Sequence, residues 1–231
     1  MITMLIRSLP LLAGIAPLVA IFGALWIGVA SDALPSCFPL IDGCISISAT
    51  GRKPPGSFLF RSVMATQPVL LVVVWYFSVL WLRSLDPELR RSTTVAILTS
   101  GIVGSVALIT YVTFLGTKEP IYEFMRRFGI YFGFLGVGVA QIVVAVALRR
   151  ICRSSRQRRF VKTARVMLGL CAAVLALGIL NMFLKRVVDD ADSSENRIEW
   201  IVFVVMQCYF FALYHAWQLT DFGVSVSTRD A

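Results

Sequence analysis

Apolar residues occur along this chain in six long blocks separated by short polar intervals. Each block is about 20 residues long, the length that an α-helix needs to cross about 30 Å of hydrocarbon. Arg7 precedes the first block as in a signal peptide, but signal peptides carry shorter apolar runs, so an uncleaved span is expected. The pattern predicts membrane-spanning helices at Leu11–Ala30, Ser62–Leu82, Thr93–Leu115, Phe128–Leu148, Val166–Leu184 and Ile198–Thr220.

The composition agrees with this pattern. Hydrophobic residues make up 58% of the chain, the mean hydropathy is +0.79, and only 15% of the residues are charged. Soluble domains carry about a quarter charged residues. No polar interval is long enough to hold a separate soluble domain. The predicted fold class is therefore all-α: residues 1–231 form one polytopic membrane bundle of six transmembrane helices, with a long loop at 31–61.

Positive charge is concentrated on one side of the predicted bundle. The interval Arg149–Arg165 carries eight basic residues and no acidic residue. Alternating spans place it with both termini and the Arg83–Arg91 interval, and these segments hold 13 basic and 4 acidic residues, against 9 of each on the other side. Lysine and arginine are enriched in cytoplasmic loops. We therefore expect cytoplasmic N and C termini and an extracytoplasmic 31–61 loop, in a plasma, inner or endomembrane.

The high isoelectric point of about 9.8 has two interpretations. A basic protein can bind nucleic acid. Here the excess charge coincides with the cytoplasmic intervals, so the sequence favours contact between the basic loop Arg149–Arg165 and anionic lipid. We expect membrane lipids as partners and no nucleic acid.

The polar stretch Cys37–Arg61 is the richest in candidate chemistry. Cys37 and Cys44 lie on the predicted outer side, where an oxidising compartment permits a disulfide, and two free thiols are the alternative. The other cysteines show no metal-ligand spacing, and a single histidine cannot supply a conventional zinc site. Asp189, Asp190 and Asp192 lack the spacing of a calcium loop. We expect no metal and no cofactor.

Several short runs in and after this stretch resemble the Frag/DRAM/Sfk family of six-span membrane proteins. The resemblance rests on Ser46–Ala49, Gly51, Pro55 and Phe60–Arg61 in the loop, on Thr110–Val112 with Glu119, and on Tyr214–His215 and Asp221–Phe222 at the end of the chain. The family includes damage-regulated autophagy modulators and a post-GPI-attachment protein associated with lipid remodelling. The loop is closer to the second branch, because Ala49 and Gly56 stand where the first has acidic residues.

One candidate site lies at the outer ends of the second and sixth predicted spans. It combines the loop hydroxyls with polar residues at the start of those spans: Ser46, Ser48, Thr50, Arg61, Gln67 and Glu199. An arginine at headgroup depth can bind phosphate, and the Gln67-Pro68 pair can kink the second span and open its outer end. A structural Arg61–Glu199 ion pair is the alternative. We expect the loop to fold back over the second and sixth spans.

The remaining polar residues favour structural roles. His215 and Asp221 lie near the inner boundary and are expected to anchor the last span to its neighbours or to the basic loop. His215 lies about 24 Å deeper than Glu199, which separates it from the loop serines and argues against a Ser-His-Asp triad. Asp86-Pro87-Glu88 is typical of a helix N-terminus.

These residues leave three classes of function. Binding or remodelling of lipid at the extracytoplasmic leaflet fits the loop and what the resemblance implies. A non-catalytic membrane scaffold or regulator fits the absence of an unambiguous catalytic set. A transporter or channel is less favoured because no charged residue lies at mid-membrane. Whether the protein is an enzyme is left open by the sequence.

Overall fold

A computed structural model describes residues 2–154, 160–187 and 191–223, and within these ranges the fold is all-helical, without strands. Six helices are long and apolar enough to cross a membrane, which confirms the predicted number of spans. They are α1 (Ile2–Ala30), α4 (Gly56–Leu85), α5 (Arg91–Thr113), α6 (Pro120–Ser154), α7 (Val161–Val187) and α8 (Ala191–Leu219). Two one-turn helices, α2 (Pro39–Asp42) and α3 (Ile47–Thr50), interrupt the long loop between α1 and α4.

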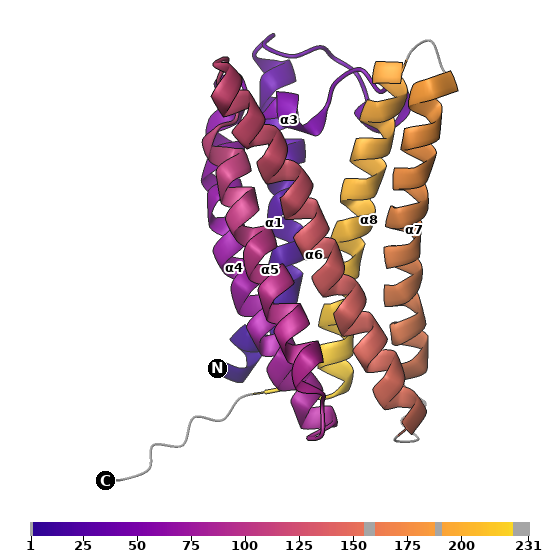
Figure 1. Cartoon of the computed structure of the whole chain (residues 1–231). Coiled ribbons are helices and arrows are strands. Elements are labelled where there is room, and N and C mark those ends of the chain that lie inside the picture. The colour runs from indigo at the N-terminus through magenta and orange to yellow at the C-terminus, as the bar shows by residue number, and fades with distance from the viewer. Residues whose placement is uncertain (1, 155–159, 188–190, 224–231) are drawn as a thin grey trace.

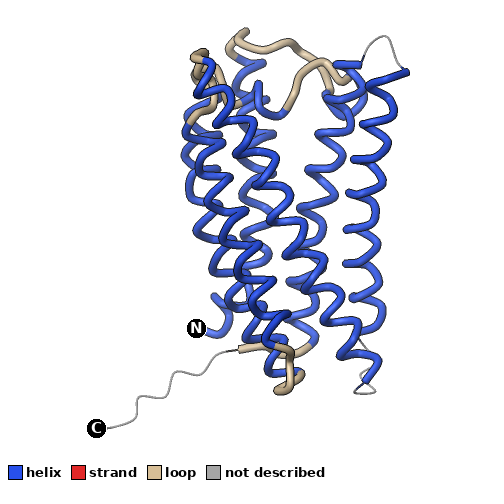
Figure 2. Tube along the Cα trace, viewed as in Figure 1, coloured by secondary structure: helices blue, strands red, loops and turns tan. Residues whose placement is uncertain are grey.

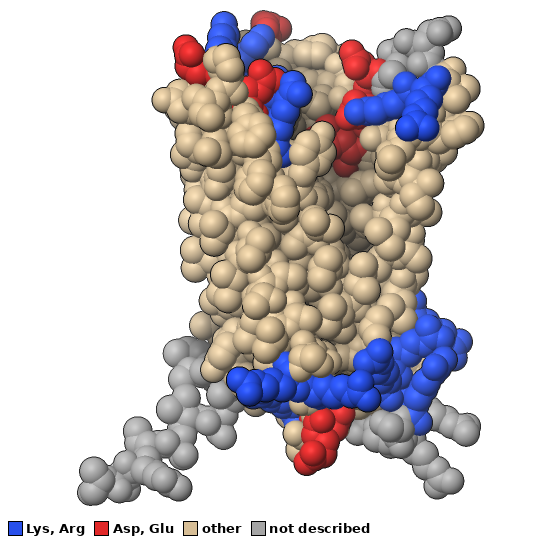
Figure 3. Space-filling view, viewed as in Figure 1, with Lys and Arg blue, Asp and Glu red and all other residues tan. Residues whose placement is uncertain are grey.

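The helices form one upright bundle whose connections gather at two opposite ends (Figures 1 and 2). We call the end that carries the α1–α4 loop the loop end, and the end that carries the α4–α5 turn the basic end. A band of lysine and arginine crosses the basic end on the face seen in Figure 3. Both ends of the described chain lie there, as the predicted topology requires. The helices continue past the apolar blocks, so α6 begins at Pro120 and not at Phe128.

Glycines bring α5 and α6 into close contact. A Cβ added to Gly136 would meet the Ser100 carbonyl oxygen at 2.6 Å, and one added to Gly129 would meet the Ala107 carbonyl oxygen at 2.7 Å. Small residues of this kind let two helices approach closely in lipid. The two helices therefore form a hairpin whose backbones touch near its middle and toward the loop end.

The first and last helices are joined at the basic end. Arg7 Nε donates a hydrogen bond to the Phe222 carbonyl oxygen at 2.6 Å, and Arg7 Nη1 lies 3.2 Å from Asp221 Oδ1. Asp221 thus anchors the end of α8 to α1, a neighbouring helix. His215 is exposed and forms no hydrogen bond with any described residue.

The Asp86-Pro87-Glu88 run differs from its predicted role, because α5 begins only at Arg91. Asp86 follows the last residue of α4, and its Oδ1 accepts a hydrogen bond of 3.2 Å from the Glu88 backbone N–H. The aspartate therefore stabilises a turn, which is the other common use of this side chain.

Candidate functional site

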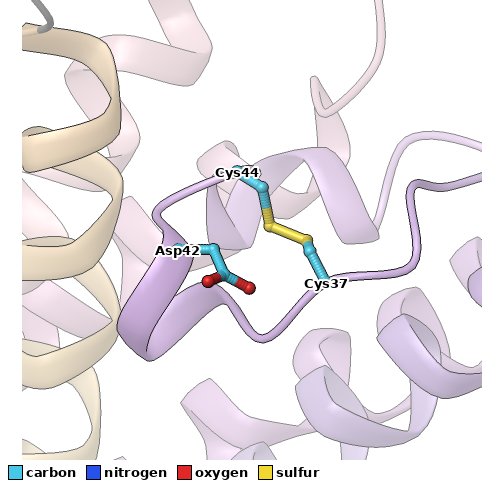
Figure 4. Close-up of side chains that lie close together, drawn as sticks. All are labelled: Cys37, Asp42 and Cys44. Atoms are coloured by element: carbon cyan, nitrogen blue, oxygen red, sulfur yellow. A yellow bond between two sulfur atoms is a disulfide. The ribbon is translucent and has the colours of Figure 1, made fainter.

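The loop between α1 and α4 is closed on itself near its middle. Cys37 and Cys44 form a disulfide with their Cα atoms 6.6 Å apart, which confirms the predicted pairing (Figure 4). Asp42 lies close to both sulfur atoms. Its Oδ2 accepts a hydrogen bond from the Phe38 backbone N–H at 2.7 Å. Cysteine binds metal as a thiolate, and two sulfur atoms bonded to each other are not thiolates. Cys37, Asp42 and Cys44 therefore stabilise the loop and do not form a metal site.

Side chains from the start of α8 hold this part of the loop through its backbone carbonyls. The bonds are Ser193 Oγ to Asp42 O (3.0 Å), Asn196 Nδ2 to Gly43 O (2.8 Å) and Trp200 Nε1 to Ile45 O (2.8 Å). Trp200 is fully buried, so its bond is shielded from water. The loop therefore folds back onto α8, as expected from the sequence.

Gly43 is the residue that this contact requires. Its φ of +64° lies in the left-handed region, which glycine adopts without steric cost. An added Cβ would also collide with the Ser193 carbonyl oxygen. Both the turn and the close approach to α8 therefore require that residue 43 has no Cβ atom.

The predicted loop hydroxyls lie around α3, and not along an extended segment. The Ser46 and Ser48 hydroxyls are 3.3 Å apart, and Arg52 Nη2 donates to Ser48 Oγ at 2.8 Å. Thr50 is buried and donates to the Ile47 carbonyl oxygen at 2.7 Å, inside its own turn. Ser48 and Arg52 thus form a polar pair, whereas Thr50 stabilises the loop.

Arg61 and Glu199 do not pair in the structure. Arg61 Nη2 donates a 2.6 Å hydrogen bond to the Leu115 carbonyl oxygen, just beyond the end of α5. The Glu199 carboxylate faces the backbone N–H groups of Ile47 and Ser48 and lies within electrostatic range of Arg52. The two side chains share a depth but have different partners, because α3 lies against Glu199.

Gln67 links α4 to α1. Its Nε2 donates a 2.8 Å hydrogen bond to the Ala13 carbonyl oxygen. Pro17, four residues after Ala13, has no backbone N–H and so cannot supply the usual helical partner of that carbonyl. Gln67 therefore replaces a hydrogen bond that the proline removes, and the residue that was expected to open the bundle joins two helices instead.

A cavity of about 70 Å³ lies inside the half of the bundle nearer the loop end, bordered by α1, α3, α4, α5, α6 and α8. Figure 3 shows the surface hollowed between α6 and α8 in this half. Its lining is mainly apolar, with Tyr111, Gln67, Gln207 and Glu199 as polar members. The Oε1 atoms of both glutamines are buried and have no hydrogen-bond partner among the described residues. Such oxygens are expected to accept a hydrogen bond from a molecule in the cavity.

Three charged residues lie near Tyr111, one of the residues that line this cavity. We call Ser48, Arg52, Arg126 and Glu199 the rim cluster. Arg52, Arg126 and Glu199 are all within electrostatic range of Tyr111, which is itself buried against the cavity. The side chain of Arg126 is 17% exposed, whereas that of Arg127 is 65% exposed, although both contact Glu123. Two cations and one carboxylate therefore lie within electrostatic range of a side chain that lines the apolar space.

Sequence reasoning missed Arg52 and Arg126. Arg52 follows Ser48 by four residues, and this spacing was the available signal for a contact across a turn. Arg126 lies before the predicted fourth span, and it became part of a helix near Tyr111 only because α6 extends back to Pro120.

The fold and the site define a class: a six-helix membrane protein whose α1–α4 loop, closed by a disulfide, borders an apolar cavity through α3. The model of the Frag1/DRAM/Sfk1/Cwh43P N-terminal domain matches residues 6–222, and the chain belongs to this family. No curated protein and no solved structure matches the chain.

Proposed function

We propose that this protein binds a membrane lipid at the extracytoplasmic leaflet, with part of one lipid chain reaching into the cavity and the headgroup at the rim cluster. The proposal takes the loop end as extracytoplasmic, in agreement with the charge distribution. The observation that carries it is the apolar cavity with a cationic rim at one end, because this is the polarity profile of a phospholipid.

The rim favours an anionic headgroup. Arg52 and Arg126 outnumber Glu199 within the rim cluster, and the nearby Glu123 has its shortest contact, 2.7 Å, with Arg127. Arginine can contact phosphate through two parallel hydrogen bonds. Gln67 and Gln207 present acceptor oxygens deeper in the cavity. A lipid with a hydroxyl or amide donor, or a water molecule beside its chain, would satisfy them.

The competing hypothesis is a non-catalytic scaffold or regulator. Arg61, Gln67 and Thr50 all bond to backbone carbonyls, and such bonds serve the fold. We therefore assign these three residues structural roles. Ser48 and Glu199 remain members of the proposed headgroup site. The two hypotheses differ in what the rim cluster does, so the test acts on that cluster.

The first experiment compares lipids that co-purify with Arg126→Gln and Arg127→Gln, quantified by mass spectrometry. Both variants lose one positive charge and one contact to Glu123. Arg126 is largely buried and lies within electrostatic range of Tyr111, which lines the cavity, whereas Arg127 is exposed. Arg126→Gln should therefore lose bound anionic lipid while Arg127→Gln keeps it. Equal lipid content in both variants and the unmodified protein would favour the scaffold.

The second experiment acts on the cavity. Phe134 lines it, whereas the neighbouring Leu135 is 61% exposed on the outer surface of α6. Phe134→Trp should narrow the cavity and reduce co-purifying lipid, and Leu135→Trp should not. A melting temperature measured for each variant separates loss of lipid from loss of fold. Lipid content that is unchanged in Phe134→Trp would contradict the proposal.

A further inference from the structure

A second and larger cavity lies at the basic end, between α5 and α6, and shares no lining residue with the first. Its volume is about 700 Å³. Its deeper wall is apolar and is formed by Ala96, Ile142, Val143 and Val146. We call this space the α5–α6 wedge.

The wedge follows from the way the two helices separate. Their backbones touch at Gly104 and Gly136, where an added Cβ would find no room. From there α6 crosses the bundle, from α5 at the loop end toward α7 at the basic end (Figure 1). The side chains of the wedge lie on the basic-end side of this contact, so the space between the helices widens toward the basic end.

The entrance to the wedge carries positive charge. Arg90 and Arg150 both line it and both are exposed. Arg90 is also the N-cap of α5 and provides no side-chain cap. Ser92 and Thr93, in the first turn of α5, also line the wedge. Helix N-termini favour anions.

Two acidic residues, Asp86 and Glu88, also line the wedge. Asp86 Oδ1 already accepts the Glu88 backbone N–H, and Glu88 is exposed. Acidic atoms protrude beyond the basic band at this end of the molecule (Figure 3). One of the two carboxylates is therefore already engaged within the turn.

We propose that the α5–α6 wedge binds one anionic phospholipid from the leaflet at the basic end, with its phosphate at Arg90 and Arg150 and a chain along the apolar wall. Measured along their helices from the basic end inward, Ala96 lies six residues deeper than Arg90, and Ile142 lies eight residues deeper than Arg150. These separations correspond to about 9 and 12 Å of depth. A free phosphate would contact only the arginines at the entrance, whereas a phospholipid would contact both the arginines and the apolar wall.

The charge arm of the test uses native mass spectrometry of the full chain titrated with phosphatidylserine or with phosphatidylcholine of the same chains. Arg90→Gln/Arg150→Gln should weaken phosphatidylserine binding by at least about tenfold. The control Arg153→Gln/Arg165→Gln removes the same charge from exposed positions that do not line the wedge. It should leave binding within about twofold. An equal loss in both double variants means diffuse attraction to the basic band and overturns the proposal, as does no loss in either.

The second part of the test narrows the apolar part of the wedge without changing the charge of the protein. Ala96→Phe places a ring inside the wedge, and Val95→Phe places the same ring on the exposed side of α5, where Val95 is 48% exposed. Ala96→Phe should weaken phosphatidylserine binding and Val95→Phe should not. Unchanged binding in Ala96→Phe, together with a loss in Arg90→Gln/Arg150→Gln, would mean that only the phosphate is held, and would overturn the lipid assignment.

Discussion

Replacing Gln67 by leucine tests whether one side chain compensates for the proline in α1. Leucine has a similar size but cannot donate to the Ala13 carbonyl oxygen, which Gln67 reaches at 2.8 Å. Pro17→Ala restores a backbone N–H four residues after Ala13, so that carbonyl regains a helical partner. Gln67→Leu should therefore be costly in the chain that keeps Pro17 and much less costly in the Pro17→Ala background.

The expected size follows from hydrogen bonding in bilayers. A buried acceptor left unpaired costs about 1–3 kcal/mol, and bonds between membrane helices couple by about 0.6 and at most about 1.7 kcal/mol. Leucine also removes the unpartnered Oε1 of Gln67, but this gain occurs in both backgrounds and cancels in the comparison. A coupling free energy of about 1 kcal/mol is expected, equivalent to about 2–4 °C in melting temperature for a chain of this size.

The assay is reversible unfolding of four proteins in mixed micelles: the unmodified chain, Gln67→Leu, Pro17→Ala and the double variant. The difference between the two costs of Gln67→Leu gives the coupling free energy directly. A cost that is the same in both backgrounds would refute the idea that Gln67 replaces the missing helical bond. It would leave the 2.8 Å contact as a geometric coincidence of packing.

Three further predictions concern orientation, the disulfide and the helical hairpin. A topology reporter at Arg52 should read extracytoplasmic and one at the C-terminus cytoplasmic, and a cytoplasmic Arg52 would reverse the assignment of both lipid sites. Protein purified without reductant should show Cys37 and Cys44 linked by mass spectrometry, and Cys37→Ser should lower stability by about 2 kcal/mol on the loop-entropy estimate; alkylation of both thiols would contradict this. Gly136→Leu should prevent close approach to Gly104 and lower the melting temperature, while Gly138→Leu should be tolerated because nothing lies within 4 Å of its added Cβ.

The number of spans, the glycine hairpin and the disulfide could be predicted because each depends on a short stretch of sequence. Length and hydrophobicity alone decide whether a helix can cross a bilayer. Cys37 and Cys44 are seven positions apart, close enough for the loop itself to bring them together. The glycines signal close contact wherever their helix meets another in lipid.

The partners in the candidate site could not be predicted in the same way. The rise per residue of a helix gives the depth of Arg61 and Glu199, but not the direction in which each side chain points. That direction depends on packing between helices distant in sequence. The turn α3 lies beside Glu199, and Arg61 instead reaches Leu115. Arg126 acquires its place only because α6 continues beyond the apolar block.

The contacts that hold the α1–α4 loop to α8 depend on the loop's backbone and not on its side chains. Ser193, Asn196 and Trp200 all bind carbonyl oxygens, which every amino acid carries. Evolution can therefore exchange most side chains on the covering segment without releasing it, provided that Gly43 is kept. We expect relatives of this protein to differ in the exposed side chains of this loop. The anchoring positions on α8 should change least.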